Sequence, residues 1–270
     1  MLRLYTLFAF LWFLSMPSQT MADRDFRLAV TTSFNNSGLT KLLIPELEKQ
    51  IKVNVDLVVT GTGQALKLGQ NGDVDAVLVH SKEAELDFIK QGYGTHRQKI
   101  MFNDFIVVGP QADPASLNTA HSALECFENL YQTKYDFISR GDDSGTHMKE
   151  KQLWLQISKN PLEFNEWYKA IGAGTGSALN IAAALNAYTL VDRASWLNFK
   201  NKAGLIILCE KDSLFFNQYS FIPISKKKHP HIKYEDALKI ENWLIESESS
   251  SIINSYKIDN KQLFYFNGNN

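Results

Sequence analysis

One local pattern occurs four times in this chain and restricts its fold more than any other feature: a glycine- and hydroxyl-rich loop leads directly into a segment with helical periodicity. The loops are VTTSFNNSG from Val30, GTGQ from Gly61, SRGDDSGT from Ser139 and GAGTGS from Gly172. Each loop lies at an expected junction between a strand and a helix. Repeated units of this kind predict an α/β protein whose sheets are mainly parallel and flanked by helices.

Apolar periodicity extends this alternation along the whole chain. Strands are expected at 26–31, 53–59, 74–79, 105–108, 136–139, 188–191, 205–209 and 220–224. Helices are expected at 39–50, from 64, at 81–91, at 122–132, through 154, at 178–185 and around 237–244. Ser37 is a candidate cap for the first of these helices, and Pro45 should kink or split it.

The alternation restarts after Gly109-Pro110, which indicates two lobes. We expect the chain to cross between the lobes at this point and again at the strand 221–224. Residues 23–107 with 219–270 would then form the first lobe, and residues 108–218 the second. Ligands of parallel sheets bind beyond the carboxyl ends of the strands, so the site is expected in the cleft between the lobes.

The four loops carry the chemistry of an anion site. A helix N-terminus exposes unpaired backbone N–H groups and the positive end of the helix dipole. Glycine lets the backbone approach a ligand closely, and Ser and Thr hydroxyls add neutral donors. One such loop is usually only a helix cap. Four of them in one chain, with Arg140 in the third, indicate a cage of donors for an oxyanion.

The composition excludes several kinds of partner. The chain has 28 basic and 29 acidic residues, a net charge of −1, so bulk charge attracts neither a nucleic acid nor a membrane surface. A bound anion must therefore be held by local dipoles and one or two cationic side chains. The 270 residues, 44% of them hydrophobic, suffice for one or two packed lobes. We expect a monomer without a cofactor.

The first 22 residues have the layout of a secretory signal peptide. Arg3 precedes an apolar run of 13 residues from Leu4 to Met16, and Thr20-Met21-Ala22 offers a small-x-small cleavage site. The run is too short to span a membrane. We therefore expect cleavage after Ala22 and export of the mature protein to the periplasm.

Cysteine and histidine usage argues against a metal centre. The chain has no CxxC or HExxH motif and no histidine pair at ligand spacing. His80, at the end of an expected strand, is interpreted as structural rather than as a ligand. Cys126 and Cys209 could pair in an oxidising compartment or remain two buried thiols, and their spacing does not decide between these alternatives.

A hydrolase and an oxyanion sensor are two alternatives to a binding protein that serves transport. Ser144 and His147 superficially resemble a nucleophile and a base, but neither a GxSxG elbow nor a third orienting group accompanies them. Capping of one helical turn and exposure to solvent explain the pair better, so a hydrolase is the less favoured alternative and we expect no enzyme. An oxyanion sensor that acts without a permease is the other alternative, because a fold does not fix a function.

The motifs together resemble a known family over essentially the whole mature chain. They are TTSFNNSGL at Thr31, VTGTGQALKLGQNGDVDAVLVH ending at His80, NDFIVVGPQADP from Asn103, FISRGDDSGTH at Phe137, GTGSALNIA at Gly174 and AYTLVDRASWL at Ala187. Their order and spacing are similar to those of the solute-binding proteins of tungstate ABC transporters, a branch of the periplasmic phosphate- and molybdate-binding-like superfamily. That family usually opens with TTTS, where this chain has Val30 before Thr31-Thr32-Ser33 and thus one hydroxyl fewer.

The resemblance implies a class II, Venus-flytrap binding protein that delivers tungstate, or molybdate, to the permease of an ABC transporter. It implies no metal ion other than the tungsten of the oxyanion. The ligand-binding residues that it carries over by motif are Thr32, Ser33, Thr62, Gly63, Arg140, Ser144, Gly145, Thr146, Thr175, Gly176 and Ser177.

Arg140 is the strongest single candidate, because its planar fork of donors suits an oxyanion. The alternative for Arg140 is an ion pair with Asp142 or Asp143. These carboxylates also bear on which anion binds: phosphate keeps a proton at neutral pH and gains from an acceptor, whereas tungstate, molybdate and sulfate are fully deprotonated and are repelled by it. Outward-turned carboxylates would favour tungstate, as the resemblance does. A phosphate- or sulfate-binding protein of the same fold is the alternative.

Overall fold

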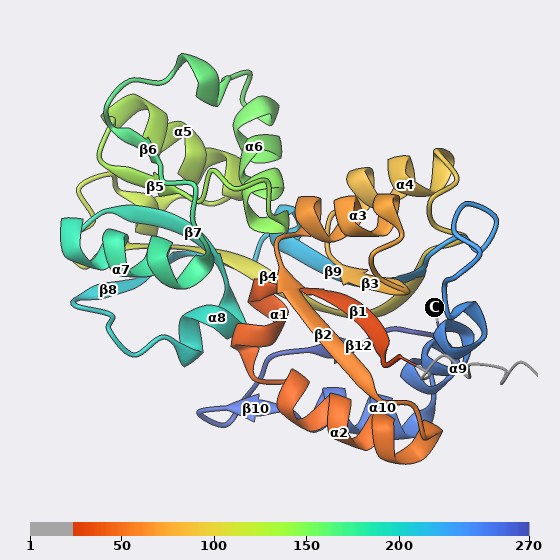
Figure 1. Cartoon of the computed structure of the whole chain (residues 1–270). Coiled ribbons are helices and arrows are strands. Elements are labelled where there is room, and N and C mark those ends of the chain that lie inside the picture. Colours follow the sequence, from red (N-terminus) through yellow and green to blue (C-terminus); the bar gives the residue numbers. More distant parts are fainter. Residues whose placement is uncertain (1–23, 270) are drawn as a thin grey trace, which may run out of the picture.

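A computed structural model describes residues 24–269 as two lobes that one long strand joins (Figure 1). The expected signal peptide, residues 1–22, lies outside the described residues. Within residues 24–269, no helix is long and apolar enough to cross a membrane. Both lobes consist of strands with helices packed on either side, as the recurrent loops predict.

The first lobe contains a sheet with strand order β2-β1-β3-β9-β4. Its strands are β1 (Phe26–Thr31), β2 (Val55–Thr60), β3 (Ala76–Val79), β4 (Gln98–Pro110), β9 (Phe216–Pro223) and β12 (Tyr265–Phe266). Its helices are α1 (Thr32–Ser37), α2 (Thr40–Ile51), α3 (Thr62–Asn71), α4 (Lys82–Lys90), α9 (Tyr234–Leu244) and α10 (Ser247–Ser255). Strand β1 pairs in parallel with β2 and β3, whereas β9 runs antiparallel to β3 and β4. A small hairpin of β10 (Lys257–Ile258) and β11 (Lys261–Gln262) follows α10.

The second lobe continues the same sheet through β4-β7-β5-β6, and β8 also pairs with β4. Its strands are β5 (Phe137–Ser139), β6 (Tyr168–Ala170), β7 (Tyr188–Asp192) and β8 (Leu205–Cys209). Its helices are α5 (Ala123–Thr133), α6 (Gly145–Gln156), α7 (Thr175–Leu185) and α8 (Arg193–Asn198). Strand β5 is parallel to β6 and β7. Three short 3₁₀ turns, at Leu117–Thr119, Pro161–Glu163 and Ser213–Phe215, complete the secondary structure.

Strand β4 connects the lobes by changing its pairing partner. It pairs with β9 up to Asp104 and with β7 from Phe105 onward. Gly109 and Pro110, where we expected a crossing, are its last two residues and pair with β8. The chain returns through residues 210–215 to β9. Residues 221–223, part of the strand where we expected the second crossing, pair with β3 inside the first lobe. A straight strand can change partners without a turn, so no turn residue marks this position in the sequence.

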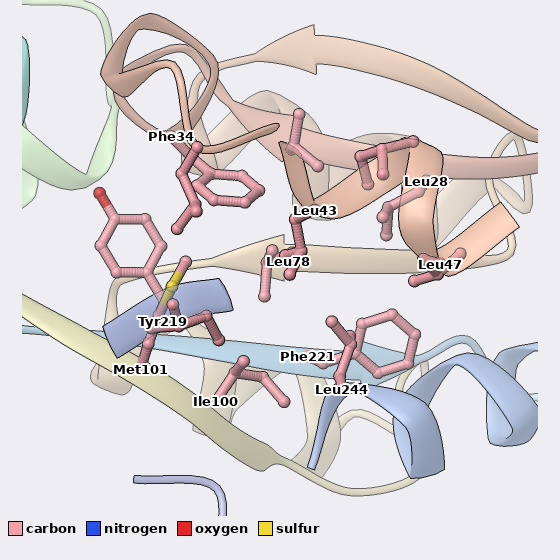
Figure 2. Close-up of a cluster of buried hydrophobic side chains, with 14 of the residues drawn as sticks. Leu28, Phe34, Leu43, Leu47, Leu78, Ile100, Met101, Tyr219, Phe221 and Leu244 are labelled. Carbon is pink, nitrogen blue, oxygen red and sulfur yellow. The ribbon is translucent and has the colours of Figure 1, made fainter. Parts of the chain in front are cut away.

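Each lobe has apolar side chains packed on both faces of its sheet. In the first lobe, α2, α9 and α10 cover one face, and α3 and α4 cover the other. In the second lobe, α5 and α6 cover one face and α7 the other. Figure 2 shows the largest cluster, in which Leu28, Leu78 and Phe221 pack under α2. Tyr219 lies at its margin with the hydroxyl pointing out of the apolar cluster, toward the second lobe (Figure 2).

The first loop contains a short helix that apolar periodicity does not predict. Ser37 ends α1 instead of capping the next helix, and its hydroxyl donates to the carbonyl oxygen of Phe34. Gly38 then turns the chain with φ +87°, a left-handed conformation that glycine adopts without strain. Helix α2 follows and runs through Pro45 without being split. Burial of its apolar face outweighs the hydrogen bond that proline cannot donate.

Cys126 and Cys209 form a disulfide, which resolves the alternative left open by the sequence. Their Cα atoms lie 6.7 Å apart, and the bond ties α5 to the end of β8 inside the second lobe. It closes a loop between residues that are 83 positions apart.

We expect the double variant Cys126→Ser, Cys209→Ser to lose about 2–4 kcal/mol of unfolding free energy, because the crosslink restricts the unfolded chain. Urea denaturation of the variant and of the oxidised protein measures this difference. The packing of the first lobe includes neither cysteine, so the stability of that lobe is the internal reference for the comparison. Identical denaturation midpoints would contradict the expectation.

Candidate functional site

The four loops meet where the two lobes face each other. They join β1 to α1, β2 to α3, β5 to α6 and β6 to α7, so each opens a helix at the carboxyl end of a strand. Arg140 links three of them: its Nη2 donates to Thr32 Oγ1 at 3.2 Å and its Nη1 donates to Thr175 Oγ1 at 2.8 Å. Gly63 N joins the remaining loop by donating to the carbonyl oxygen of Asp143 at 3.2 Å. Figure 1 shows α1, α3 and α6 next to one another at this point.

Arg140 also makes the ion pair that the sequence offered as the alternative. Its Nη2 donates to Asp142 Oδ2 at 2.6 Å, and the other oxygen of Asp142 accepts from Ser144 N at 3.2 Å. The Arg140 side chain is 3% exposed, so little water screens this pair. Asp143 instead turns outward to Lys151. The two interpretations of Arg140, as a donor of the anion site and as the ion-pair partner of Asp142, are therefore compatible. Arg140 contacts two loop hydroxyls and Asp142 at once.

Four buried donors in these loops lack a hydrogen-bond partner within the described part of the chain. They are Thr62 Oγ1, Ser139 Oγ, Arg140 Nε and Thr146 Oγ1. Thr62 is the first residue of α3, and Thr146 lies in the first turn of α6. An unpaired buried polar group costs about 1–3 kcal/mol. A ligand that accepts hydrogen bonds at this point would remove that cost.

Ser33 connects the first loop to two side chains that motif reasoning did not place in the site. Its Oγ lies 3.0 Å from His80 Nε2 and 3.4 Å from the hydroxyl of Tyr219. His80 is buried, and this burial, with the positive charge of Arg140, lowers the pKa of the imidazole to about 3. The ring is therefore neutral at physiological pH. His80 follows β3, the neighbour of β1, so the rule about strand ends could have placed it here.

Gly145 lies directly against the His80 ring. A Cβ atom on Gly145 would come within 2.4 Å of His80 Cε1 and 2.6 Å of Nδ1. Glycine is therefore the residue that allows the start of α6, from the second lobe, to approach β3 of the first lobe this closely.

Asp192 is a further buried carboxyl group near Arg140. Its Oδ1 caps α8 by accepting from Ser195 N at 2.9 Å, and its Oδ2 has no partner among residues 24–269. Burial raises its pKa to about 6, and hydrogen bonds from Ser195 and the charge of Arg140 oppose this shift. In the sequence, Asp192 stands within the motif AYTLVDRASWL, which indicates no role for this carboxyl group.

Comparison with known proteins places this arrangement in a family. The profile of the PBP superfamily domain matches residues 17–245. A curated tungstate-binding protein TupA of Peptoclostridium acidaminophilum is 40% identical over 240 residues, 88% of this chain and 83% of that protein. The chain belongs to the tungstate-binding branch of the PBP superfamily. The relatives are named as binding proteins and not as enzymes.

Solved structures of the tungstate-binding branch agree with the fold. The tungstate-binding protein TupA of Desulfovibrio alaskensis G20 is 37% identical, with a TM-score of 0.76 over 90% of this chain and 98% of that one. The tungstate ABC transporter structure from Geobacter sulfurreducens is 42% identical, with a TM-score of 0.78 over 87% of this chain and 100% of that one. The predicted α/β, two-lobed class II fold and the predicted family are confirmed.

Three positions of the motifs differ from the others in their surroundings. Ser177 is exposed on α7, and Gly176 lines a cavity of 280 Å³ together with Thr175 and Ser195. Val30, which replaces the usual family threonine, is buried in the apolar core with Leu28 and Phe34. Because its side chain lies in that cluster, a hydroxyl at this position would not be one of the converging donors.

The Ser144 and His147 pair has the geometry of a helix cap. Ser144 Oγ accepts from the backbone N of His147 at 3.3 Å, and His147 Nδ1 accepts from the backbone N of Asp143. The predicted cap is confirmed, although Ser144 is buried and not solvent-exposed. Within the described residues, no group of three or more His, Cys, Asp or Glu side chains could hold a metal ion.

Proposed function

We propose that this protein captures tungstate, or molybdate, between its lobes and delivers it to the permease of an ABC transporter. The observation that carries the proposal is the buried guanidinium of Arg140, which reaches the Thr32 hydroxyl of the first lobe and the Thr175 hydroxyl of the second. The family supports it, since relatives of up to 40% identity are named as tungstate-binding proteins.

The donors around Arg140 suit an oxyanion that carries no proton. Thr62 and Thr146 offer hydroxyls without partners, and the helix starts offer backbone N–H groups. Both oxygens of Asp142 already accept hydrogen bonds from the protein. Asp142 is therefore engaged as a partner of Arg140 and is not held open as an acceptor for the proton of hydrogen phosphate. This favours tungstate and molybdate over phosphate.

Domain closure is the mechanism that this arrangement supports. An anion that contacts donors from both lobes binds the closed form more tightly than the open form, and it thereby shifts the population toward closure. The closed form would then dock to the permease. In this proposal the protein acts as a monomer in the periplasm, after removal of residues 1–22, and catalyses no reaction.

A calorimetric panel of tungstate, molybdate, sulfate and phosphate on residues 23–270 tests the proposal. We expect one tungstate per chain, and stabilisation by about 2.7 kcal/mol at 100 times the Kd, which raises the Tm by roughly 5–10 °C. Phosphate at the concentration that saturates the protein with tungstate should produce neither heat nor a shift. A response to phosphate alone would overturn the assignment, and it would direct attention to the unpartnered Oδ2 of Asp192 as the acceptor.

A further inference from the structure

A second cavity lies between the lobes, and its lining includes His80, the side chain that contacts Ser33. Its volume is about 400 Å³, and its walls come from the start of α4, from β4 and β9 in the first lobe, and from α6 and the turn at residues 213–215 in the second. His80 and Gly145 are part of its lining. We call it the lysine cavity, after Lys82, Lys99 and Lys149 in its walls.

The lysine cavity carries an excess of positive charge. Lys82, Arg97, Lys99 and Lys149 line it, against the single carboxylate of Glu83. Arg97 is paired with the buried Glu85. The three lysines have no carboxylate within 4 Å among residues 24–269. For a chain with a net charge of −1, this concentration of cations is local and not a property of the whole surface.

Lys149 shows most clearly that a negative partner is missing. It is half-buried on α6, and its ammonium donates to the carbonyl oxygen of Leu214 at 3.1 Å. Burial lowers its pKa, and the nearby charge of Glu83 only partly opposes this. Glu83 itself accepts a hydrogen bond from Gln152 at 2.7 Å across the lobes. An anion in the cavity would compensate the charge of Lys149.

The His80 side chain belongs both to the lysine cavity and to the group of loop hydroxyls. The Nε2 atom of His80 forms a hydrogen bond with Ser33 Oγ. The Nδ1 atom of the same ring is buried without a hydrogen-bond partner in the described chain. Only 6% of His80 is exposed, and the residue contributes both to the wall of the lysine cavity and to the site around Ser33. At about 30 Å³ per water molecule, the cavity holds roughly a dozen waters. An anion could therefore keep most of its hydration shell there and would bind weakly.

We propose that the lysine cavity is a second anion subsite, which binds a hydrated inorganic dianion weakly and supplies it to the site around Arg140. The supply role rests on the proposed function, whereas binding of a dianion in the cavity does not. Clefts lined by charge of one sign raise association rates by about 10- to 1000-fold. The lysines should therefore control how fast tungstate arrives and not how fast it leaves.

Stopped-flow tryptophan fluorescence on the triple variant Lys82→Gln, Lys99→Gln, Lys149→Gln tests the supply role. We expect the association rate of tungstate to fall about tenfold at low salt and to lose most of its salt dependence. The dissociation rate should change less than twofold. The matched control is Lys226→Gln, Lys227→Gln, Lys228→Gln, which removes the same charge from a remote turn of the first lobe. An unchanged association rate, or an equal fall in the control, would overturn the supply role, and a tenfold faster dissociation would make the lysines part of the primary site.

A labelling experiment tests the subsite independently of tungstate binding. Lysines are modified by reductive methylation with sodium sulfate or with sodium chloride of equal ionic strength, and each site is quantified by mass spectrometry. Sulfate should slow the labelling of Lys99 and Lys149 several-fold and leave Lys226–Lys228 unchanged. The same protection is expected in Arg140→Ala, whose primary site is disabled. Equal labelling in the two salts would overturn the subsite even where tungstate binds, whereas protection without tungstate binding would overturn only the proposed function.

Discussion

Replacing Arg140 with alanine is expected to weaken tungstate binding by about 2 kcal/mol or more, which is roughly 30-fold in Kd. Among residues 24–269, the guanidinium contributes the only buried positive charge at the meeting point of the loops, and it bonds a hydroxyl of each lobe. Its loss therefore removes both a charge-assisted donor and a link between the lobes. Isothermal titration calorimetry with tungstate measures the change.

Loss of Arg140 also leaves Asp142 without its partner, so the variant needs a control for folding. Removing one member of a buried ion pair is strongly destabilising, whereas removing both members is often tolerated. The double variant Arg140→Ala, Asp142→Asn should therefore recover thermal stability but not tungstate affinity. Arg27→Ala, which loses only a half-exposed pair with Asp56, should bind tungstate normally. Wild-type affinity in the double variant would remove Arg140 from the site.

Gly145→Ala is expected to reduce tungstate affinity at least tenfold, or by about 1.4 kcal/mol, through a steric effect alone. The added methyl group would lie 2.4 Å from His80 Cε1. A shift of the imidazole is opposed by its hydrogen bond with Ser33 and by its packing against Tyr219 at 4.7 Å and Phe105 at 6.0 Å between ring centroids. The start of α6 must therefore move away, and the second lobe with it. Titration calorimetry on the variant provides the measurement.

Gly176→Ala is the matched control for this substitution. Gly176 also lies in the first turn of a helix, and a Cβ atom there meets nothing within 4 Å. We expect its tungstate affinity and its Tm to stay near those of the wild type. In Gly145→Ala, the ligand-free Tm should change little, and the rise in Tm on adding tungstate should be lost. If the two variants bind tungstate equally well, contact between α6 and His80 is not required for closure.

Much of the fold could be predicted because strands and helices leave local signals. The strands 26–31 and 205–209 were predicted with their observed bounds, and α7 and β7 were predicted to within a few residues. Failures occurred where tertiary contacts override local preference. Helix α2 continues through Pro45 because its apolar face is buried, and β4 is far longer than its predicted apolar core of 105–108.

In the candidate site, too, some residues could be predicted from local patterns, whereas others are placed there only by tertiary contacts. Arg140, Thr32 and Thr175 could be selected because glycine and hydroxyl residues before a helix form a recognisable local pattern. His80 and Tyr219 could not be chosen on such grounds, since a histidine at a strand end and a tyrosine in an apolar strand fit any core. Their roles follow from contacts between segments that are 47 and 186 residues apart.

The sequence by itself determined the α/β fold and the four loops, because hydrophobic periodicity and helix-start chemistry are encoded within a few consecutive residues. The family followed from the resemblance of its motifs, in their order and spacing, to those of known proteins. Only the tertiary structure decided that Arg140 holds Asp142 and the hydroxyls of both lobes simultaneously, and that Val30 faces the core. It also decided that Cys126 and Cys209 pair and that three lysines without a carboxylate partner among the described residues share one cavity. These facts depend on distances between remote segments, which the packing of the two lobes sets and no local pattern records.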